Sequence, residues 1–199
     1  YKITRGQILF KGEDITHLST AERVKLGMGI AFQRPPVLRG VKLADMLNIC
    51  MGRKMDELTP EQVRLAEELN LVDFLSRDVN YGFSGGEIKR SEILQLVAQQ
   101  PTFTMLDEPD SGVDIENMEL VGNVISHLLR GDGLPSARKR GALIVTHQGY
   151  ILRYVKADRG HVMLNGFIAC HGHPDELLEE IMKLGYEGCV KHCLKKTKQ

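Results

Sequence analysis

The sequence has no tryptophan, few aromatic residues and no excess of charge of either sign. Of its 199 residues, 6% are aromatic and 42% are hydrophobic, while 26 basic residues balance 26 acidic ones. A neutral chain has no global electrostatic field with which to hold a polyanion, so nucleic acid is not the expected partner. The hydrophobic content is still enough to cover a packed sheet in one sizeable domain.

Long apolar runs and a cysteine framework are also absent. No run approaches the ~18 residues that a membrane span requires, and the N-terminus lacks the charged-then-apolar pattern of a signal peptide. We therefore expect no insertion into a membrane and a cytoplasmic location. Four cysteines, Cys50, Cys170, Cys189 and Cys193, do not suggest a disulfide framework in a chain of this length. Neither Cys189 nor Cys193 belongs to a C-x-x-C pair, which favours ordinary helix positions over metal ligands.

The order of apolar and amphipathic segments indicates an α/β fold. Strands followed by helices and then by further strands imply right-handed parallel crossovers. Helical spacing of apolar residues within 41–75 predicts a small helical subdomain, and Asn165-Gly166 predicts a hairpin turn. The expected elements are strands at 7–10, 29–32, 103–106 and 142–146, helices starting at Ser19 and spanning 87–99, 117–129 and 174–184, and hairpin strands at 161–164 and 167–169.

Polar side chains follow three of the expected parallel strands. Gln33 follows the first, Asp107 and Glu108 follow the second, and His147 follows the third. Ligands collect outside the carboxyl ends of such strands. Asp107 could hold a magnesium ion that Gln33 could also reach, and Glu108 could polarise an attacking water that His147 or Gln33 orients. The alternative stays open that the acids start a solvated turn and that the histidine is structural.

The segment Ser84-Gly85-Gly86-Glu87 stands at the start of an expected helix. Ser-x-x-Glu at this place is a good capping box, which is a purely structural interpretation. A cap does not need two glycines, however, because glycine costs backbone entropy. Two glycines at a helix N-terminus expose backbone N–H groups, which together with the Ser84 hydroxyl could contact a phosphate.

These motifs, together with Ser111-Gly112-Val113-Asp114, occur in the order and spacing of ATP-binding-cassette (ABC) ATPases, which the chain resembles over essentially its whole length. The resemblance implies a P-loop-NTPase-type, mostly parallel sheet flanked by helices, with a small helical subdomain, and it implies ATP and Mg²⁺ as cofactors. It assigns Gln33 to the Q-loop, Asp107 and Glu108 to Walker B, and His147 to the switch histidine. It also implies a homodimer with shared ATP sites, in which five residues bind nucleotide. The five residues are Ser84, Gly85, Gly86, Glu87 and Asp114. Of these, Ser84 to Gly86 contact the nucleotide that the opposite subunit holds.

Within this family, several stretches resemble the Suf-system ATPases (SufC type), which act on a scaffold for iron-sulfur cluster assembly. The stretches are Tyr81 to Glu87, Lys89-Arg90, Glu92 to Gln95, Asp110 to Ile115, and Ala31-Phe32-Gln33 with a proline close behind. The resemblance implies SufB/SufD-like scaffold proteins as partners. Pro109 is the residue that transporter ATPases usually carry after the acidic pair, so a nucleotide-binding subunit of a membrane transporter is the alternative. A degenerate cassette that docks without hydrolysing ATP is a third.

The sequence contains no phosphate-binding P-loop, which requires G-x-x-x-x-G-K-[ST]. None of the 20 glycines is followed by lysine. The family places this loop ahead of Tyr1, so we expect the chain to be part of something longer, to expose core surface and to bind ATP poorly. The resemblance divides the rest into the start of the catalytic core at 1–40, the helical subdomain at 41–80, and the remainder of the core at 81–199.

Overall fold

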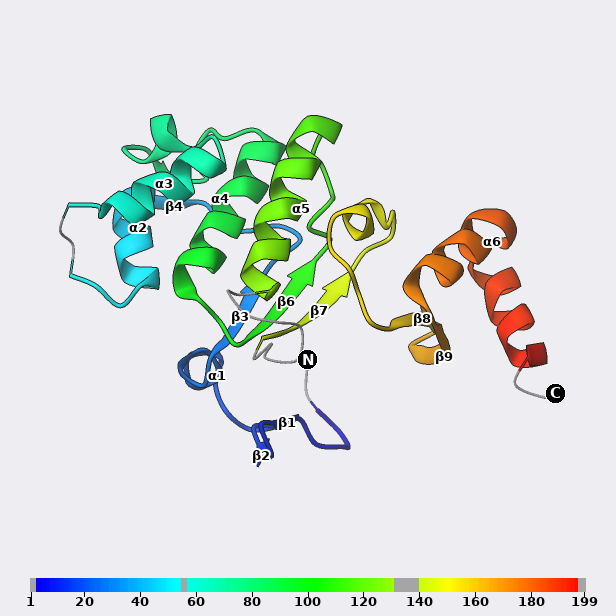
Figure 1. Ribbon diagram of the computed structural model, residues 1–199. Coiled ribbons are helices and arrows are strands. Elements are labelled where there is room, and N and C mark those ends of the chain that lie inside the picture. Colours follow the sequence, from blue (N-terminus) through cyan, green and yellow to red (C-terminus); the bar gives the residue numbers. More distant parts are fainter. Residues whose placement is uncertain (1–2, 55–56, 131–139, 197–199) are drawn as a thin grey trace. The chain divides into compact units, whose positions relative to one another are not determined.

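The computed structural model describes residues 3–54, 57–130 and 140–196 (Figure 1). The chain separates into two compact units, Tyr1–Thr146 and His147–Gln199. Each unit has its own sheet and its own buried core. In the described part of the chain, no helix is both long enough and apolar enough to cross a membrane.

A parallel three-stranded sheet lies at the centre of the first unit. Its order is β3 (Met28–Ala31), β6 (Phe103–Asp107) and β7 (Gly141–Val145). Both pairings are parallel, with Ala31 opposite Leu106 and Asp107 opposite Val145. All three carboxyl ends therefore lie at the same edge of the sheet, which confirms the predicted α/β class.

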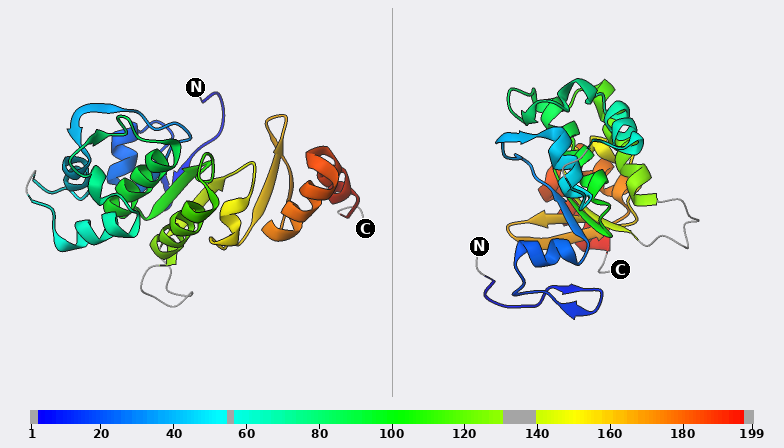
Figure 2. Two further views of the ribbon diagram at one scale, coloured as in Figure 1. Left: turned by 90° about the horizontal axis from the view of Figure 1, so that it is seen from above. Right: turned by 90° about the vertical axis from the view of Figure 1, so that its left-hand side faces the viewer.

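Two long helices, α4 (Gly85–Gln99) and α5 (Ile115–Arg130), lie side by side in the first unit (Figures 1 and 2). Helix α4 also packs on β3. It begins at the predicted capping box and ends at Gln100, whose φ of 54° is left-handed, just before Pro101. Fully buried side chains of the core include Leu94 of α4, Leu106 of β6 and Ile125 of α5.

The remaining elements of the first unit are short. A hairpin of β1 (Leu9–Phe10) and β2 (Glu13–Asp14) precedes α1 (Thr20–Lys25), and Ser19 and Glu22 form the predicted capping box. The predicted helical stretch contains α2 (Leu43–Cys50), α3 (Pro60–Glu68) and the 3₁₀ turn η1 (Val72–Phe74). An antiparallel pair, β4 (Leu38–Lys42) and β5 (Asp78–Val79), joins the two ends of this stretch. Sequence patterning missed that pair, because two residues in β5 are too few to show alternation.

Strand β7 is apolar but poorly covered. Leu143 is 52% exposed and Val145 47%. In the described part of the chain, β7 pairs only with β6. Folded proteins usually cover an apolar edge strand of this kind.

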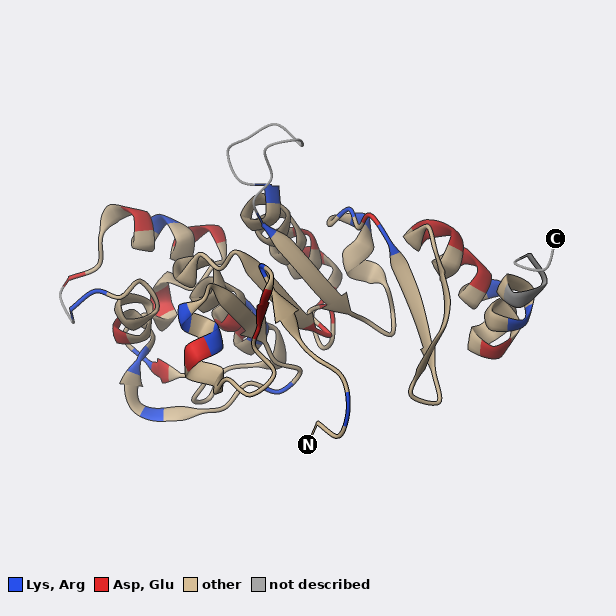
Figure 3. Ribbon diagram, turned by 90° about the horizontal axis from the view of Figure 1, so that it is seen from below, with Lys and Arg blue, Asp and Glu red and all other residues tan. Residues whose placement is uncertain are grey.

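Charges of both signs are interspersed over the described surface of the first unit, as Figure 3 shows from one side. The equal numbers of acidic and basic residues are therefore not separated into large fields on this face.

The second unit consists of a hairpin and a helical tail. The 3₁₀ turn η3 (Tyr150–Arg153) precedes β8 (Gly160–Leu164) and β9 (Phe167–Gly172), which are antiparallel. The turn residues Asn165 and Gly166 have φ of 51° and 81°, as the predicted Asn-Gly hairpin turn requires. Helix α6 (Pro174–Lys196) is interrupted at Gly185, where we expected it to stop, but a second helical segment follows. Cys189 and Val190 of that segment are buried in the core of the unit, which explains why it continues.

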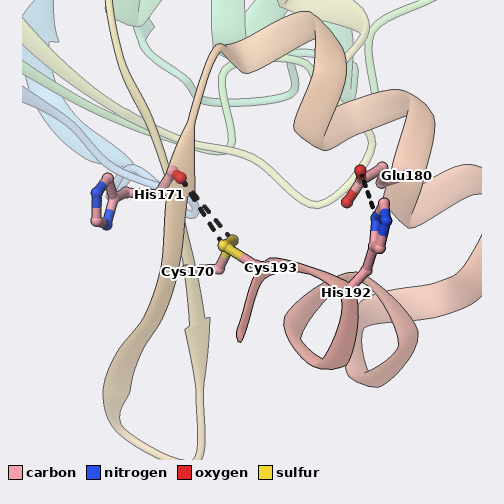
Figure 4. Close-up of a disulfide and its surroundings, with 5 residues drawn as sticks. All are labelled: Cys170, His171, Glu180, His192 and Cys193. Carbon is pink, nitrogen blue, oxygen red and sulfur yellow. Dashed lines mark hydrogen bonds and ion pairs between the residues drawn. A yellow bond between two sulfur atoms is a disulfide. The ribbon is translucent and has the colours of Figure 1, made fainter. Parts of the chain in front are cut away.

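A disulfide joins Cys170 of β9 to Cys193 of α6, with a Cα–Cα distance of 6.1 Å (Figure 4). The sequence-based expectation that the cysteines form no disulfide framework is wrong for this pair. The error arose because the two cysteines lie 23 positions apart in the sequence and only the return of the second helical segment towards the hairpin brings them together. Nearby, His192 Nδ1 lies 2.8 Å from a Glu180 oxygen. Among the described residues, no three His, Cys, Asp or Glu side chains are grouped as metal ligands.

Reduction of the Cys170–Cys193 disulfide should destabilise the second unit. A cross-link that closes a loop of 23 residues removes unfolded-state entropy worth about 3 kcal/mol. We expect a dithiol reductant to lower the free energy of unfolding of this unit by roughly that amount, as measured by denaturant titration with a probe on α6. Cys50→Ser, which leaves the disulfide intact, is the control. Non-reducing peptide mapping that finds no Cys170–Cys193 linkage would contradict the prediction.

Candidate functional site

The ends of β3 and β6 place Gln33 beside Glu108. Because Ala31 pairs with Leu106, the residues that follow these strands emerge at one edge of the sheet. The Gln33 side-chain Nε2 donates a hydrogen bond to Glu108 Oε2 over 2.7 Å. Two residues 75 positions apart in sequence are thus in direct contact at the carboxyl edge, where phosphate ligands collect in such sheets.

The backbone at Glu108 turns sharply away from the strand. Its φ is 48°, in the left-handed region that non-glycine residues rarely adopt, and its N–H donates to the Val145 carbonyl over 2.8 Å. Strained residues of this kind cluster at functional sites, where the surrounding structure fixes a side chain that would otherwise follow the strand. The strand end of β7 therefore helps to aim the Glu108 carboxylate.

Asp107 is the last residue of β6, and its side chain is exposed. Together with the Gln33 amide it offers hard oxygen ligands of the kind that Mg²⁺ binds, usually with several waters and substrate phosphates completing the shell. The chemistry of these residues fits a magnesium ion at this edge.

Asp110 anchors the loop after β6. The sequence motifs include this residue but predict no contact for it. Asp110 is 3% exposed, and both of its carboxylate oxygens accept from the Thr146 hydroxyl, over 3.0 and 2.7 Å. Thr146 follows β7 directly, so this contact joins the polypeptide after β6 to the polypeptide after β7. The sequence shows a threonine, Thr146, at the end of a predicted strand and a third acid, Asp110, shortly after Asp107 and Glu108. Neither position by itself indicates that the two side chains are hydrogen-bonded.

The segment Ser84 to Glu87 forms the N-terminus of α4. Ser84 N–H donates to Glu87 Oε2 over 2.7 Å, and Glu87 N–H donates to Ser84 Oγ over 3.4 Å, so the capping box is present. A Cβ at Gly85 or Gly86 would meet only the Gly112 carbonyl, at 3.6 and 3.9 Å, which is ordinary contact. Neither glycine has a left-handed φ. Within the described chain, neither the backbone conformation nor the surrounding contacts therefore require glycine at these two positions.

Asp114 directly precedes α5 and is the last of the predicted nucleotide-binding residues. Its carboxylate accepts from the Asn117 backbone N–H over 2.9 Å and from the Asn117 side chain over 2.7 Å. The hydrogen bond from the Asn117 backbone, followed by that from its side chain, lowers the pKa of the Asp114 carboxyl. Its neighbour Ile115 is 85% exposed.

His147 is the first residue of the second unit, and its side chain is exposed. Its backbone carbonyl accepts a hydrogen bond from the Tyr186 hydroxyl over 3.3 Å. Its predicted role at the nucleotide stays a prediction.

The chain matches the family model of the ABC transporter over residues 1–111. It is 37% identical over 198 residues to the probable ATP-dependent transporter ycf16 of Trieres chinensis, covering 94% of this chain and 76% of that protein. It is 36% identical over 200 residues to a probable ABC transporter ATP-binding protein of Streptococcus pyogenes, with 96% and 75% covered. The chain therefore belongs to the ABC transporter ATP-binding family.

Solved structures agree with this assignment. An ATP-binding cassette of an ABC transporter in its ADP conformation has a TM-score of 0.66 and 25% identity, covering 98% of this chain and 78% of that one. A bacterial Atm1-family ABC exporter with ATP bound has a TM-score of 0.69 at 20% identity, covering 100% and 33%. The second likeness shows the fold alone.

Loss of the Thr146 hydroxyl should destabilise the first unit. In Thr146→Val, a methyl group replaces a donor to a buried carboxylate, and such a loss costs about 1–3 kcal/mol. Thr146→Ser keeps the hydroxyl and should stay much closer to the wild-type free energy of unfolding, measured by denaturant titration. Destabilisation by Thr146→Ser together with little effect of Thr146→Val, which keeps the methyl group, would mean that the methyl packing of Thr146, and not its bond to Asp110, matters.

Proposed function

We propose that this chain supplies most of an ATP-hydrolysing cassette that works as a homodimer and changes the conformation of a bound partner assembly. The observation that carries the proposal is the hydrogen bond between Gln33 and Glu108 at the carboxyl edge of the sheet. It brings the two strand ends to one place, as hydrolysis at a single γ-phosphate requires.

The proposed division of roles follows the chemistry of each side chain. Glu108 polarises the attacking water, and the Gln33 amide fixes the orientation of its carboxylate. Asp107 and Gln33 would hold the magnesium ion, which neutralises charge on the phosphates when bound. His147 orients the γ-phosphate or the water. These 199 residues contain no G-x-x-x-x-G-K-[ST] phosphate-binding loop, so the chain alone should bind ATP weakly.

Two features support the homodimer with shared sites. Gly85 and Gly86 leave the N-terminus of α4 open to an incoming phosphate, although no contact within the described chain requires glycine there. Ile115, beside Asp114, exposes an apolar side chain that a second copy could cover. In the proposed dimer, Ser84 to Glu87 and Asp114 of one subunit contact the nucleotide that the other subunit holds.

The identity of the partner rests on two competing signals. The stretches around Tyr81 to Gln95 and Asp110 to Ile115 favour a SufB/SufD-like scaffold of iron-sulfur cluster assembly, with the ATPase in the cytoplasm. Pro109 favours a membrane transporter, and so do the names of the relatives, which call them transporters or transporter ATP-binding proteins. We propose the scaffold as the first candidate and the transporter as the second.

Substitution of Glu108 by glutamine should abolish hydrolysis and trap the ATP-bound dimer. In the protein that carries the phosphate-binding loop, we expect kcat to fall by a factor of about 100 or more, since the general base is lost while its shape is kept. The dimer should then persist with ATP in size-exclusion chromatography. The 199-residue chain, which lacks the loop, serves as the negative control. Turnover that survives the change would exclude Glu108 as the base.

Affinity capture of the full-length protein from its own cells should separate the two partner candidates. We expect a soluble scaffold to be recovered without detergent, and in similar yield from the soluble and the detergent-treated extract. Recovery of polytopic membrane proteins only after detergent extraction would favour the transporter. A Glu108→Gln bait with ATP, compared with the same bait with ADP, should increase the yield of a genuine partner because closure is trapped.

A further inference from the structure

Helix α4 carries an ion pair that is buried in the first unit. Lys89 is 4% exposed and Glu92 6%, and their side chains approach to 3.6 Å. Desolvation raises the pKa of the Glu92 carboxyl, while the Phe32 N–H and Lys89 act in the opposite direction. A buried pair of charges is costly and contributes little net stability unless further hydrogen bonds satisfy both groups. The role of the Lys89–Glu92 pair therefore depends on the other hydrogen bonds that these two side chains make.

Those contacts converge on Phe32, the residue directly before Gln33. The Phe32 N–H donates to Glu92 Oε1, and the Phe32 carbonyl accepts from Lys89 Nζ over 2.5 Å. Lys89 Nζ also donates to the carbonyl of Asp107 over 3.5 Å. The pair thus binds both polar backbone groups at the end of β3 and reaches the end of β6.

The other end of α4 is attached to the start of the same strand. Gln99 Nε2 donates to the Met28 carbonyl over 3.1 Å. A Cβ at Gly29 would lie only 2.7 Å from Leu96 Cδ1 and 2.9 Å from Pro101 Cγ, so helix and strand approach as closely as glycine allows. Because α4 is fixed to β3 at both ends, a displacement of the helix must move the strand end or break these contacts.

We infer that Lys89 and Glu92 are positioning residues for Gln33, through which the Ser84–Gly86 segment at the start of α4 influences the Gln33–Glu108 contact of its own subunit. Only two residues separate Gly86 from Lys89, so movement of the helix N-terminus reaches the pair within one turn. When the pair moves, the backbone groups of Phe32 that it binds must move with it. Gln33 is the next residue, so its side-chain amide is displaced as well. Since coupling is reciprocal, a change at Gln33 also alters what Ser84–Gly86 binds. The inference rests on the proposed function and adds how one subunit connects its two binding surfaces.

The first experiment reads the contact itself and needs no nucleotide. The double variant Lys89→Met/Glu92→Leu replaces both buried charges by apolar side chains, a change that buried ion pairs often tolerate. We expect the full-length protein to keep its cooperative unfolding, while hydrogen exchange at the Phe32 and Gln33 amides accelerates by about 10-fold or more. Arg64→Met/Glu68→Leu, which removes an exposed pair on α3, is the matched control and should leave these amides unchanged. Unchanged exchange in the Lys89/Glu92 variant would overturn the inference.

The second experiment asks whether the pair acts through Gln33. In the ATP-hydrolysing full-length protein, we expect the double variant to lower kcat by about 10-fold or more with little change in KM, because it removes orientation and not nucleotide contacts. In a Gln33→Ala background, the same change should cost less than about 2-fold further, since residues that act as a unit are not additive. Full additivity would overturn the positioning role.

The two experiments also separate this inference from the proposed function. A wild-type protein that hydrolyses no ATP would overturn the proposed function and the catalytic part of the inference, while the exchange measurement would still establish or reject the contact with Phe32. Hydrolysis with normal kinetics in the double variant would leave the proposed function intact and reject the inference alone.

Discussion

The parallel pairing of β3 with β6 is the constraint on which the candidate site depends. It sets Ala31 opposite Leu106, so that Gln33 and Glu108 leave the sheet at the same height and their side chains meet. A shift of this register by one residue would turn the side chains of one strand to the other face and separate the pair. The chemistry at this edge is therefore specified by backbone hydrogen bonds that lie inside the sheet.

Helix α4 adds a second level of control to the same edge. Its N-terminus carries the serine and glycines of the family motif, and its next turn carries the buried pair that binds the Phe32 peptide. In the proposed function, α4 thus contributes to nucleotide binding through its N-terminus and to the position of Gln33 through Lys89 and Glu92. The contacts to the Phe32 peptide account for Lys89 and Glu92 among the buried residues of α4, while the buried Arg90 donates to the Leu69 and Asn70 carbonyls.

Sequence patterns predicted the features whose signals are local. The capping boxes at Ser19 and Ser84, the Asn165-Gly166 turn and the strand that ends at Asp107 are each encoded within a few neighbouring residues. The family motifs located the Gln33 and Glu108 strand ends, although they did not specify the hydrogen bond between them. No pattern indicated that Asp110 bonds to Thr146, because such a contact joins residues 36 positions apart and depends on the completed sheet.

The same limit applied to the charged residues of α4. Lysine and glutamate three residues apart are typical of a solvated helix face, and only the packing of α4 on β3 buries Lys89 and Glu92. Helix α6 showed the converse. Gly185 has the left-handed φ of a helix stop, yet burial of Cys189 and Val190 gives the next segment a reason to remain helical.

The cross-link between Cys170 and Cys193 makes the two units respond differently to their surroundings. In the first unit, the described cysteine, Cys50, is a free thiol, so thiol reductants leave its covalent framework unchanged. The second unit has a small core of Val162, Leu177 and Val190 with three cysteines in or beside it, and part of its cohesion is covalent. Reduction of the disulfide would therefore loosen the carboxyl-terminal quarter of the chain, while the covalent structure of the described part of the first unit, with the sheet that bears Glu108, stayed unchanged.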